Sequence, residues 1–346
     1  MPETAARRGE TPLVSVVLCA FEGRRYLEPQ LESLLAQSHR SLQVIAIDDG
    51  SRDGTRECLA AYATADPRIE LVAHERREGM VARLEEGLAC VRGEYVLPAD
   101  QDDVWALDKV STLLARIGEH AAIYSASALI DAGGRPLGGT LLAALNGLEP
   151  VSGRDPWRLF WHNTVSGHAT LFRASLIPEL VPFDRGLVYD HQIGILATVR
   201  GGLAYTDLPL VQHRVHRGNQ MTRLPDPSRR PRDPARRGER RIASRWRERT
   251  TLAAHGAFFA RRGIDPAFGA RDAAGLRRAR VEFSRRSFDL ALFRLLLRQR
   301  RRLLRGAPSP VRRAWSTARS ERWYGRSRGS QASTADALVG ARGTER

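Results

Sequence analysis

Between residues 13 and 131, short apolar runs rich in β-branched residues alternate with stretches of helical periodicity, and this alternation constrains the fold most strongly. After the first run, Leu27, Leu31, Leu34 and Leu35 recur on one face of a 3.6-residue period. Strands that alternate with helices of this length form βαβ units, whose mostly parallel sheet is covered by helices on both faces. Ligands of such domains bind beyond the C-terminal ends of the strands. The predicted strands cover residues 13–21, 42–48, 69–74, 95–99 and 121–130.

Two of these strand ends carry clustered carboxylates. The second strand finishes in Asp48-Asp49-Gly50-Ser51 and the fourth in Asp100-Gln101-Asp102-Asp103. Acids gathered at one sheet edge repel a phosphate ligand unless a cation lies between them, and all-oxygen ligands select Mg²⁺ or Mn²⁺. The alternative is that these acids cap the helices that follow, as Asp often does. Two clusters at neighbouring strand ends favour the cation site.

Several common classes of protein are excluded by missing motifs. The first strand ends in CAFEGRR rather than G-x-G-x-x-G, and G-x-x-x-x-G-K-[ST] occurs nowhere, which excludes a dinucleotide-binding dehydrogenase and a P-loop nucleotidase.

The three cysteines, Cys19, Cys58 and Cys90, form no disulfide or zinc pattern and favour a reducing compartment. The N-terminus lacks the apolar stretch of a signal peptide, and the apolar run 290–297 is too short for a bilayer. We expect a cytoplasmic protein.

The net charge of +16 is divided unevenly along the chain. Residues 1–200 carry 20 basic and 27 acidic side chains, net −7, whereas residues 201–346 carry 35 and 12, net +23. Residues 223–240 are predicted to be a Pro/Arg-rich linker and residues 306–346 a disordered tail. Residues 241–305 are predicted to be helical, with apolar residues among many arginines. They either attach to the anionic inner face of a membrane or form a helical cap on the preceding domain.

Five blocks in order carry a resemblance to a known family. VSVVLCAFEGRRYLEPQLESLLAQSH and LQVIAIDDGSRDGT resemble the opening of family-two glycosyltransferases of the GT-A fold. EGMVARLEEGLACVRGEYVLPADQDDVWALDKV is similar to the rhamnosyltransferase-like branch, in which D-Q-D-D-x-W followed by Lys is typical. NTVSGHATLFRASL, YDHQIGILAT and PLVQHRVHRGNQ are similar to later blocks of that branch. The resemblance implies a GT-A catalytic domain over residues 12–222 that binds a nucleoside-diphosphate sugar.

The resemblance also implies a role for each matching position on the donor side. Asp49 matches the acid that accepts a hydrogen bond from a pyrimidine N–H, which suits an acceptor-only carboxylate. Asp100 and Asp102 match the D-x-D signature, whose second acid usually faces the metal that bridges the diphosphate. Arg83 falls where a basic residue often faces the diphosphate, although a solvated helix face is the alternative. The segment that lies along the nucleotide matches Ala20, Phe21 and Glu22.

The D-x-D signature is followed by three further candidates, Asp103, Trp105 and Lys109. Asp103 either extends the signature or caps a helix before Val104. Trp105 is expected to pack in the core rather than to serve as a stacking platform. Lys109 is the single lysine of an arginine-rich chain, which suggests a point-charge contact to the donor that a planar guanidinium would not replace.

The later blocks supply the remaining candidates. Asp190 matches the family's catalytic base, and His191 beside it is either catalytic or a structural histidine. In-line displacement with inversion needs one base for the acceptor hydroxyl and one electrophile for the leaving diphosphate. Arg214 is assigned to the diphosphate, and His216 to the metal, the acceptor or a structural role. His213 stands where the branch usually has an aromatic residue.

The sequence therefore predicts an inverting, metal-dependent glycosyltransferase. Deoxythymidine-diphosphate rhamnose is the donor that the branch implies, with a UDP-sugar as the other choice, and Mg²⁺ or Mn²⁺ as the cofactor. The expected acceptor is a cell-surface glycan or its lipid-linked precursor. A nucleotidyltransferase is one alternative, although it would typically need a Gly-rich basic loop after the first strand. A nucleic-acid-binding protein is another, although its basic charge should form a patch interleaved with aromatic residues.

Overall fold

The computed structural model describes residues 11–145, 148–159, 162–216 and 218, together with a few positions between 254 and 297. The chain divides into two units, residues 1–229 and 230–346. All the named helices and strands lie in the first unit, and the predicted linker and tail lie outside the described residues. The same holds for the predicted helical extension, of which only isolated positions are described. Among the described residues, no helix is both long and apolar enough to cross a bilayer.

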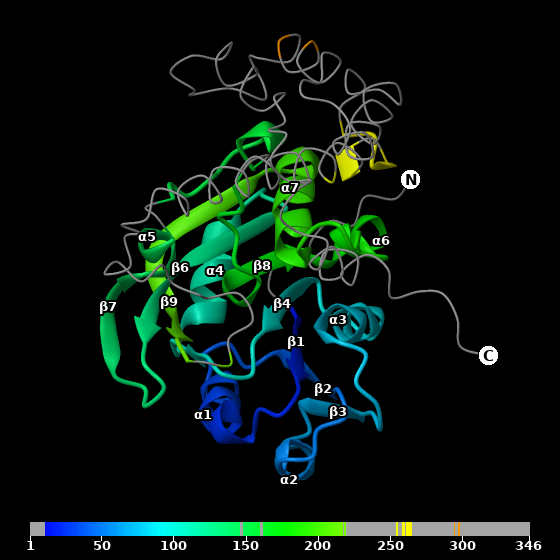
Figure 1. The fold of residues 1–346 in the computed structure, drawn as a ribbon, viewed down its shortest axis with the longest axis vertical. Coiled ribbons are helices and arrows are strands. Elements are labelled where there is room, and N and C mark those ends of the chain that lie inside the picture. Colours follow the sequence, from blue (N-terminus) through cyan, green and yellow to red (C-terminus); the bar gives the residue numbers. More distant parts are fainter. Residues whose placement is uncertain are drawn as a thin grey trace, which may run out of the picture. The chain divides into compact units, whose positions relative to one another are not determined.

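The sheet is parallel in its first half, from β1 to β4, as predicted. β1 is flanked by β2 and β4, β3 lies beyond β2, and all of these pairs are parallel. Ala20 pairs with Asp48, so the carboxyl ends of β1 and β2 reach the same edge. Figure 1 shows these strands with their connecting helices. The elements are β1 (Val14–Ala20), α1 (Arg24–Leu35), β2 (Leu42–Asp48), α2 (Thr55–Ala65), β3 (Ile69–Ala73), α3 (Met80–Ala89) and β4 (Tyr95–Ala99).

The second half makes the sheet mixed rather than mostly parallel. β8 lies between β4 and β6 and is antiparallel to both. β7 pairs antiparallel with β6, and β5 pairs antiparallel with β9. β9 runs parallel to β6. The strand order is therefore β3-β2-β1-β4-β8-β6-β9-β5, with β7 beside β6. The elements of this half are β5 (Val104–Trp105), α4 (Lys109–Ile117), β6 (Ala122–Ile130), β7 (Pro136–Thr140), α5 (Leu141–Ala144), η1 (Pro156–Leu159), η2 (Gly167–Ala169), β8 (Thr170–Arg173), η3 (Ala174–Leu176), α6 (Ile177–Leu180), α7 (Tyr189–Arg200) and β9 (Leu203–Arg214).

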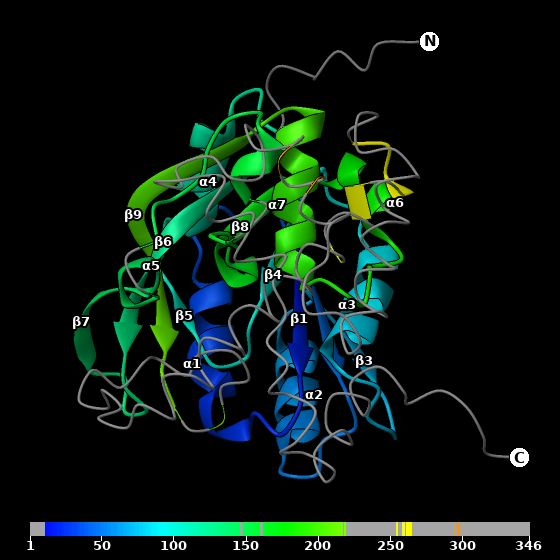
Figure 2. The same ribbon diagram turned by 45° about the horizontal axis from the view of Figure 1, so that its top comes forward.

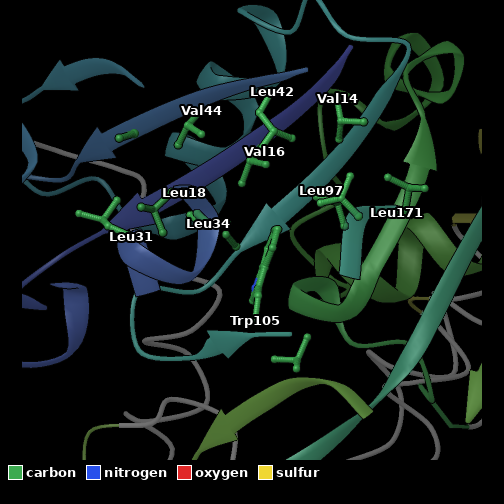
Figure 3. Packing of buried hydrophobic residues seen from close by; sticks show 14 of the residues in the cluster. Val14, Val16, Leu18, Leu31, Leu34, Leu42, Val44, Leu97, Trp105 and Leu171 are labelled. Atoms are coloured by element: carbon green, nitrogen blue, oxygen red, sulfur yellow. The ribbon is translucent and has the colours of Figure 1, made fainter. Parts of the chain in front are cut away.

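Helices cover both faces of β1, which explains why almost every residue of this strand is buried. Val14, Val16 and Leu18 point to one face and join the core cluster with leucines of α1 (Figure 3). Val17 points to the other face, where α3 approaches so closely that a Cβ on Gly87 would lie 2.4 Å from Val17 Cγ1. Figure 2 shows β1 running between α1 and α3. The predicted α/β architecture with helices on both faces is confirmed.

Candidate active site

The candidate site lies at the carboxyl ends of β1, β2 and β4. Asp49 follows β2, and its Oδ1 accepts hydrogen bonds from Glu78 N at 2.8 Å and from Arg83 Nε at 2.8 Å. Its Oδ2 accepts one hydrogen bond, from Gly79 N at 2.8 Å. Burial raises the pKa of Asp49, but these hydrogen bonds outweigh burial and hold the pKa below its usual value. Asp49 is therefore a carboxylate at neutral pH, with acceptor capacity left on Oδ2.

Arg83 of α3 is buried and contacts three acids. Its buried guanidinium pairs with Asp49, with Glu86 at 3.1 Å and with Glu78 at 3.4 Å. It is therefore not a solvated residue on a helix face, and its contact with the diphosphate stays a prediction. In this structure Arg83 orients the Asp49 carboxylate.

The end of β1 is held by a residue that the sequence reasoning did not select. The Gln101 side chain accepts from Phe21 N at 2.8 Å and donates to Phe21 O at 3.0 Å. A Cβ on Gly23 would lie 2.1 Å from Gln101 Oε1, so this close approach requires glycine. Glu22 accepts a hydrogen bond from Arg52 N at 3.0 Å. The middle residue of D-Q-D therefore fastens the segment that begins at Ala20 to the acids on either side of it.

Asp102 and His216 come together across 114 residues of sequence, with His216 Nε2 2.7 Å from Asp102 Oδ2. Two ligands of one Mg²⁺ or Mn²⁺ in octahedral geometry lie about 3 Å apart, so this pair of donor atoms fits such a cation. Burial raises the pKa of Asp102, and the neighbouring acids Asp100 and Asp103 add to the rise. A cation would relieve this repulsion. The Asp100 side chain is 40% exposed and remains accessible beside the pair.

Asp103 forms a separate, fully buried cluster with two histidines. Its Oδ1 accepts from His213 Nδ1 at 3.0 Å and from Arg214 N at 3.1 Å. Burial lowers the pKa of His213, but the Asp103 contact outweighs it and raises the pKa to about 9, so the pair is ionic. The alternative of a helix cap is wrong, because Val104 begins strand β5 instead.

His168 belongs to the same cluster and was not identified from the sequence. Its Nδ1 lies 3.7 Å from Asp103 Oδ2, and its ring stacks on that of His213 with centroids 4.8 Å apart and planes 6° apart. The three ligand atoms lie within 4.8 Å of one another, a spacing compatible with a cation. However, imidazole lone pairs lie in the ring planes, so stacked rings direct them along parallel lines rather than to one point. We therefore interpret this cluster as a buried ion pair rather than a cation site.

Two basic candidates are buried supports in this structure. Arg214 donates from Nε to Asp102 O at 2.8 Å, and its guanidinium lies over the Tyr26 ring at 4.9 Å. Lys109 is fully buried, donates to His168 O at 2.6 Å and lies 3.2 Å from the Trp105 ring centroid. The expected contact of Lys109 with the donor stays a prediction. Trp105 is buried in the core cluster, as expected of a packing residue.

Asp190 lies in the first turn of α7 and is half-buried. It accepts hydrogen bonds from Asn163 Nδ2 at 2.8 Å and from Gly167 N at 3.4 Å. Burial raises the pKa of Asp190 to about 6, which is the range that suits a general base near neutral pH. His191 beside it is buried and donates from Nε2 to Leu159 O at 2.6 Å, so its side chain has a structural role in this fold.

Fold and site together define the class of protein: a GT-A-type α/β domain with acids gathered at its strand ends. The model of the family "Glycosyl transferase family 2" matches residues 15–180. The chain is 37% identical over 114 residues to the putative teichuronic acid biosynthesis glycosyltransferase TuaG of Bacillus subtilis, covering 33% of this chain and 45% of that protein. An uncharacterized glycosyltransferase of Haemophilus influenzae is 27% identical over 220 residues, covering 61% of this chain and 68% of that protein. These matches support a family 2 glycosyltransferase.

The fold comparison agrees. The structure of Staphylococcus aureus TarS 1–349 in complex with UDP-GlcNAc matches with a TM-score of 0.50 at 17% identity, covering 82% of this chain and 80% of that one. At this identity the match shows the fold alone. The chain spans less than half of TuaG, so the activity of the whole protein is treated below as a proposal.

Proposed function

We propose that this protein transfers a sugar, with inversion, from a nucleoside-diphosphate sugar to a hydroxyl of a cell-surface glycan or its lipid-linked precursor. The observation that carries the proposal is the placement of three groups at the carboxyl edge of one sheet. These are the Asp49 acceptor, the Asp102–His216 pair and the perturbed carboxyl of Asp190. The similarity to TuaG, whose name refers to teichuronic acid biosynthesis, supports a glycan acceptor.

Donor binding begins with the base and the diphosphate. Asp49 Oδ2 accepts a single hydrogen bond within the described chain and has capacity for the N–H of a pyrimidine ring. The segment Ala20–Phe21–Glu22 would lie along the nucleotide, held by Gln101. Asp102, Asp100 and His216 would hold Mg²⁺ or Mn²⁺, which when bound neutralises the charge of the leaving diphosphate. Arg214 keeps Asp102 in place through its main-chain oxygen.

The chemical step assigns the proton to Asp190. The acceptor oxygen forms a bond to the anomeric carbon while the bond from that carbon to the diphosphate oxygen breaks on the opposite face. The hydroxyl proton passes to the Asp190 carboxylate. Asn163 and Gly167 N orient this carboxylate, and its pKa of about 6 leaves it mostly ionised at neutral pH yet basic enough to share the proton.

A donor panel tests the proposal. Deoxythymidine-diphosphate rhamnose is our expected donor, because the branch resemblance points to it; UDP-GlcNAc, UDP-glucose and GDP-mannose complete the panel. Thermal shift with Mn²⁺ and with EDTA should select one donor in the presence of metal, and that donor should release its nucleoside diphosphate when an acceptor is added. Absence of a metal-dependent shift with every donor would refute the proposal. Release of pyrophosphate from a nucleoside triphosphate would instead identify the nucleotidyltransferase that the matches do not favour.

Attachment to the membrane is the last part of the proposal. Residues 241–305 lie almost entirely outside the described residues, so its support is the excess of arginine over acid in the C-terminal half of the chain. A lipid-linked acceptor would place the reaction at the inner face of an anionic membrane. Peripheral attachment through these arginines fits that location.

A further inference from the structure

One buried amine has no role in the mechanism above. Lys109 begins α4, and its side chain is shielded completely from solvent. Burying an ammonium group is unfavourable unless its partners compensate for lost hydration. Its direct contacts here are the Trp105 ring, 3.2 Å from Nζ to the centroid, and the main-chain oxygen of His168 at 2.6 Å. Burial lowers the pKa of Lys109 well below its usual value, although the charges of Asp103 and Asp100 oppose this. An aliphatic residue would fill this part of the core without that desolvation cost, so the hydrogen bond to His168 calls for an explanation.

The oxygen that Lys109 holds belongs to η2, and this short turn contacts acids on both sides of the candidate site. Gly167 N donates to Asp190 Oδ2 at 3.4 Å. One residue later, His168 Nδ1 lies 3.3 Å from Asp100 Oδ2. The expected base and the first acid of D-x-D are therefore connected through two consecutive residues.

The turn has little freedom to move independently of its neighbours. A Cβ on Gly167 would lie 1.9 Å from Tyr189 Oη, so η2 packs directly against the residue that precedes Asp190. From the side of β6, Ser127 Oγ lies 3.0 Å from His168 Nε2. Lys109 supplies a third attachment, from α4. A displacement of η2 would change the distance between Asp190 and the D-x-D acids.

We propose that Lys109 is a positioning residue, which holds η2 through the carbonyl of His168 and thereby sets the spacing between Asp190 and Asp100. This inference rests on the proposed function, because it assigns Lys109 a purpose in sugar transfer. It predicts that loss of the Lys109 contact impairs the chemical step more than donor binding. A purely structural lysine would instead affect the stability of the fold.

The test compares Lys109→Met with the full-length wild-type protein. Met fills a similar volume and removes both the hydrogen bond and the buried amine, so the melting temperature should stay equal or rise. A misplacement of about 1 Å at reacting groups lowers the rate by about 10²-fold, so kcat should fall by about that factor. KM for the donor and its Kd with Mn²⁺ should stay within about threefold of wild type, because the Asp49 acceptor and the Asp102–His216 pair lie outside η2.

Two further variants sharpen the test. Leu113→Ala removes a buried side chain from the same helix, so it should lower the melting temperature while the kcat of the folded enzyme stays near wild type. Ser127→Ala removes the contact between β6 and His168 of η2 without altering Lys109. It should lower kcat in the same direction as Lys109→Met and leave donor affinity unchanged, and it serves in its place if Lys109→Met does not fold.

Each outcome decides the inference. A reduced kcat with unchanged donor affinity and an undiminished melting temperature supports it. A kcat near wild type in Lys109→Met, or a fall of kcat that accompanies equal losses of donor affinity and stability, overturns it while leaving the proposed function intact. Failure of the wild-type protein to transfer any sugar refutes the proposed function first, and the positioning role falls with it.

Discussion

Replacement of Asp190 by Asn removes the proposed base while keeping the size and shape of the side chain. The Asn163 contact at 2.8 Å can be retained by the amide oxygen of the variant. Loss of a general base lowers rates by about 10²–10⁴-fold, which is about 2.7–5.4 kcal/mol of transition-state stabilisation. We expect kcat to fall within this range and donor affinity to change little, because Asp190 lies apart from the Asp49 and Asp102 contacts.

Although Asp190→Asn should lower kcat, it should raise the stability of the fold at neutral pH. Burial raises the pKa of Asp190 from 3.8 to about 6, although Gly167 N, Asn163 and the nearby His168 lower it. Because the unfolded chain loses this proton at lower pH, the stability contribution is complete below about pH 4 and is lost as pH rises through 6. A shift of about 2 pKa units corresponds to at most about 3 kcal/mol at pH 7. Asp190→Asn should therefore melt higher than wild type at pH 7 and near it at pH 4.5.

Three measurements check this reasoning on the full-length protein. Nucleoside-diphosphate release at saturating donor gives kcat, calorimetric titration gives donor affinity, and thermal melts between pH 4.5 and 8 give the stability difference. The wild-type pH profile of kcat/KM should rise with an apparent pKa of about 6 and then level, and this limb should vanish in the variant. An Asn variant that keeps transfer within tenfold of wild type, or that shows the same acid limb, would refute the assignment of Asp190.

Further predictions address the metal, the packing and the membrane. Asp102→Asn should abolish transfer and remove the Mn²⁺ dependence of donor binding in calorimetry; full activity in the variant or in EDTA would contradict the metal site. Gly87→Ala should lower the free energy of unfolding in urea by about 1–3 kcal/mol, because its Cβ would lie 2.4 Å from Val17 Cγ1; unchanged stability would show that α3 can shift away. Full-length protein should co-sediment with anionic vesicles at low salt and be released at high salt, since each engaged arginine contributes about 1 kcal/mol and salt screens the attraction within about 10 Å at 0.1 M. Equal recovery of a 1–235 truncation would leave the helical cap as the role of 241–305.

The strands, the helices between them and the acids at their ends were predictable because their signals are local. Leu27, Leu31 and Leu34 indicate one helix face, and β1 and β2 are mostly apolar runs because both of their faces are buried. The positions of Asp49 and Asp102 follow directly from the ends of those strands. The family resemblance then singled out Asp190 and His216, which local pattern alone does not relate to the strand ends.

The sequence by itself determined the architecture of the first half and the kind of chemistry at its edge, because periodicity and strand ends are properties of neighbouring residues. The tertiary structure decided which side chains meet. His168 reaches Asp103, and Lys109 reaches His168, only because β8 enters the sheet antiparallel between β4 and β6. It also decided that the Arg83 and Lys109 side chains are buried, with Asp49 and the His168 carbonyl as partners. Such contacts depend on the order of strands that lie far apart in the sequence, and the residues next to a charged side chain in sequence do not indicate which distant residue it will contact.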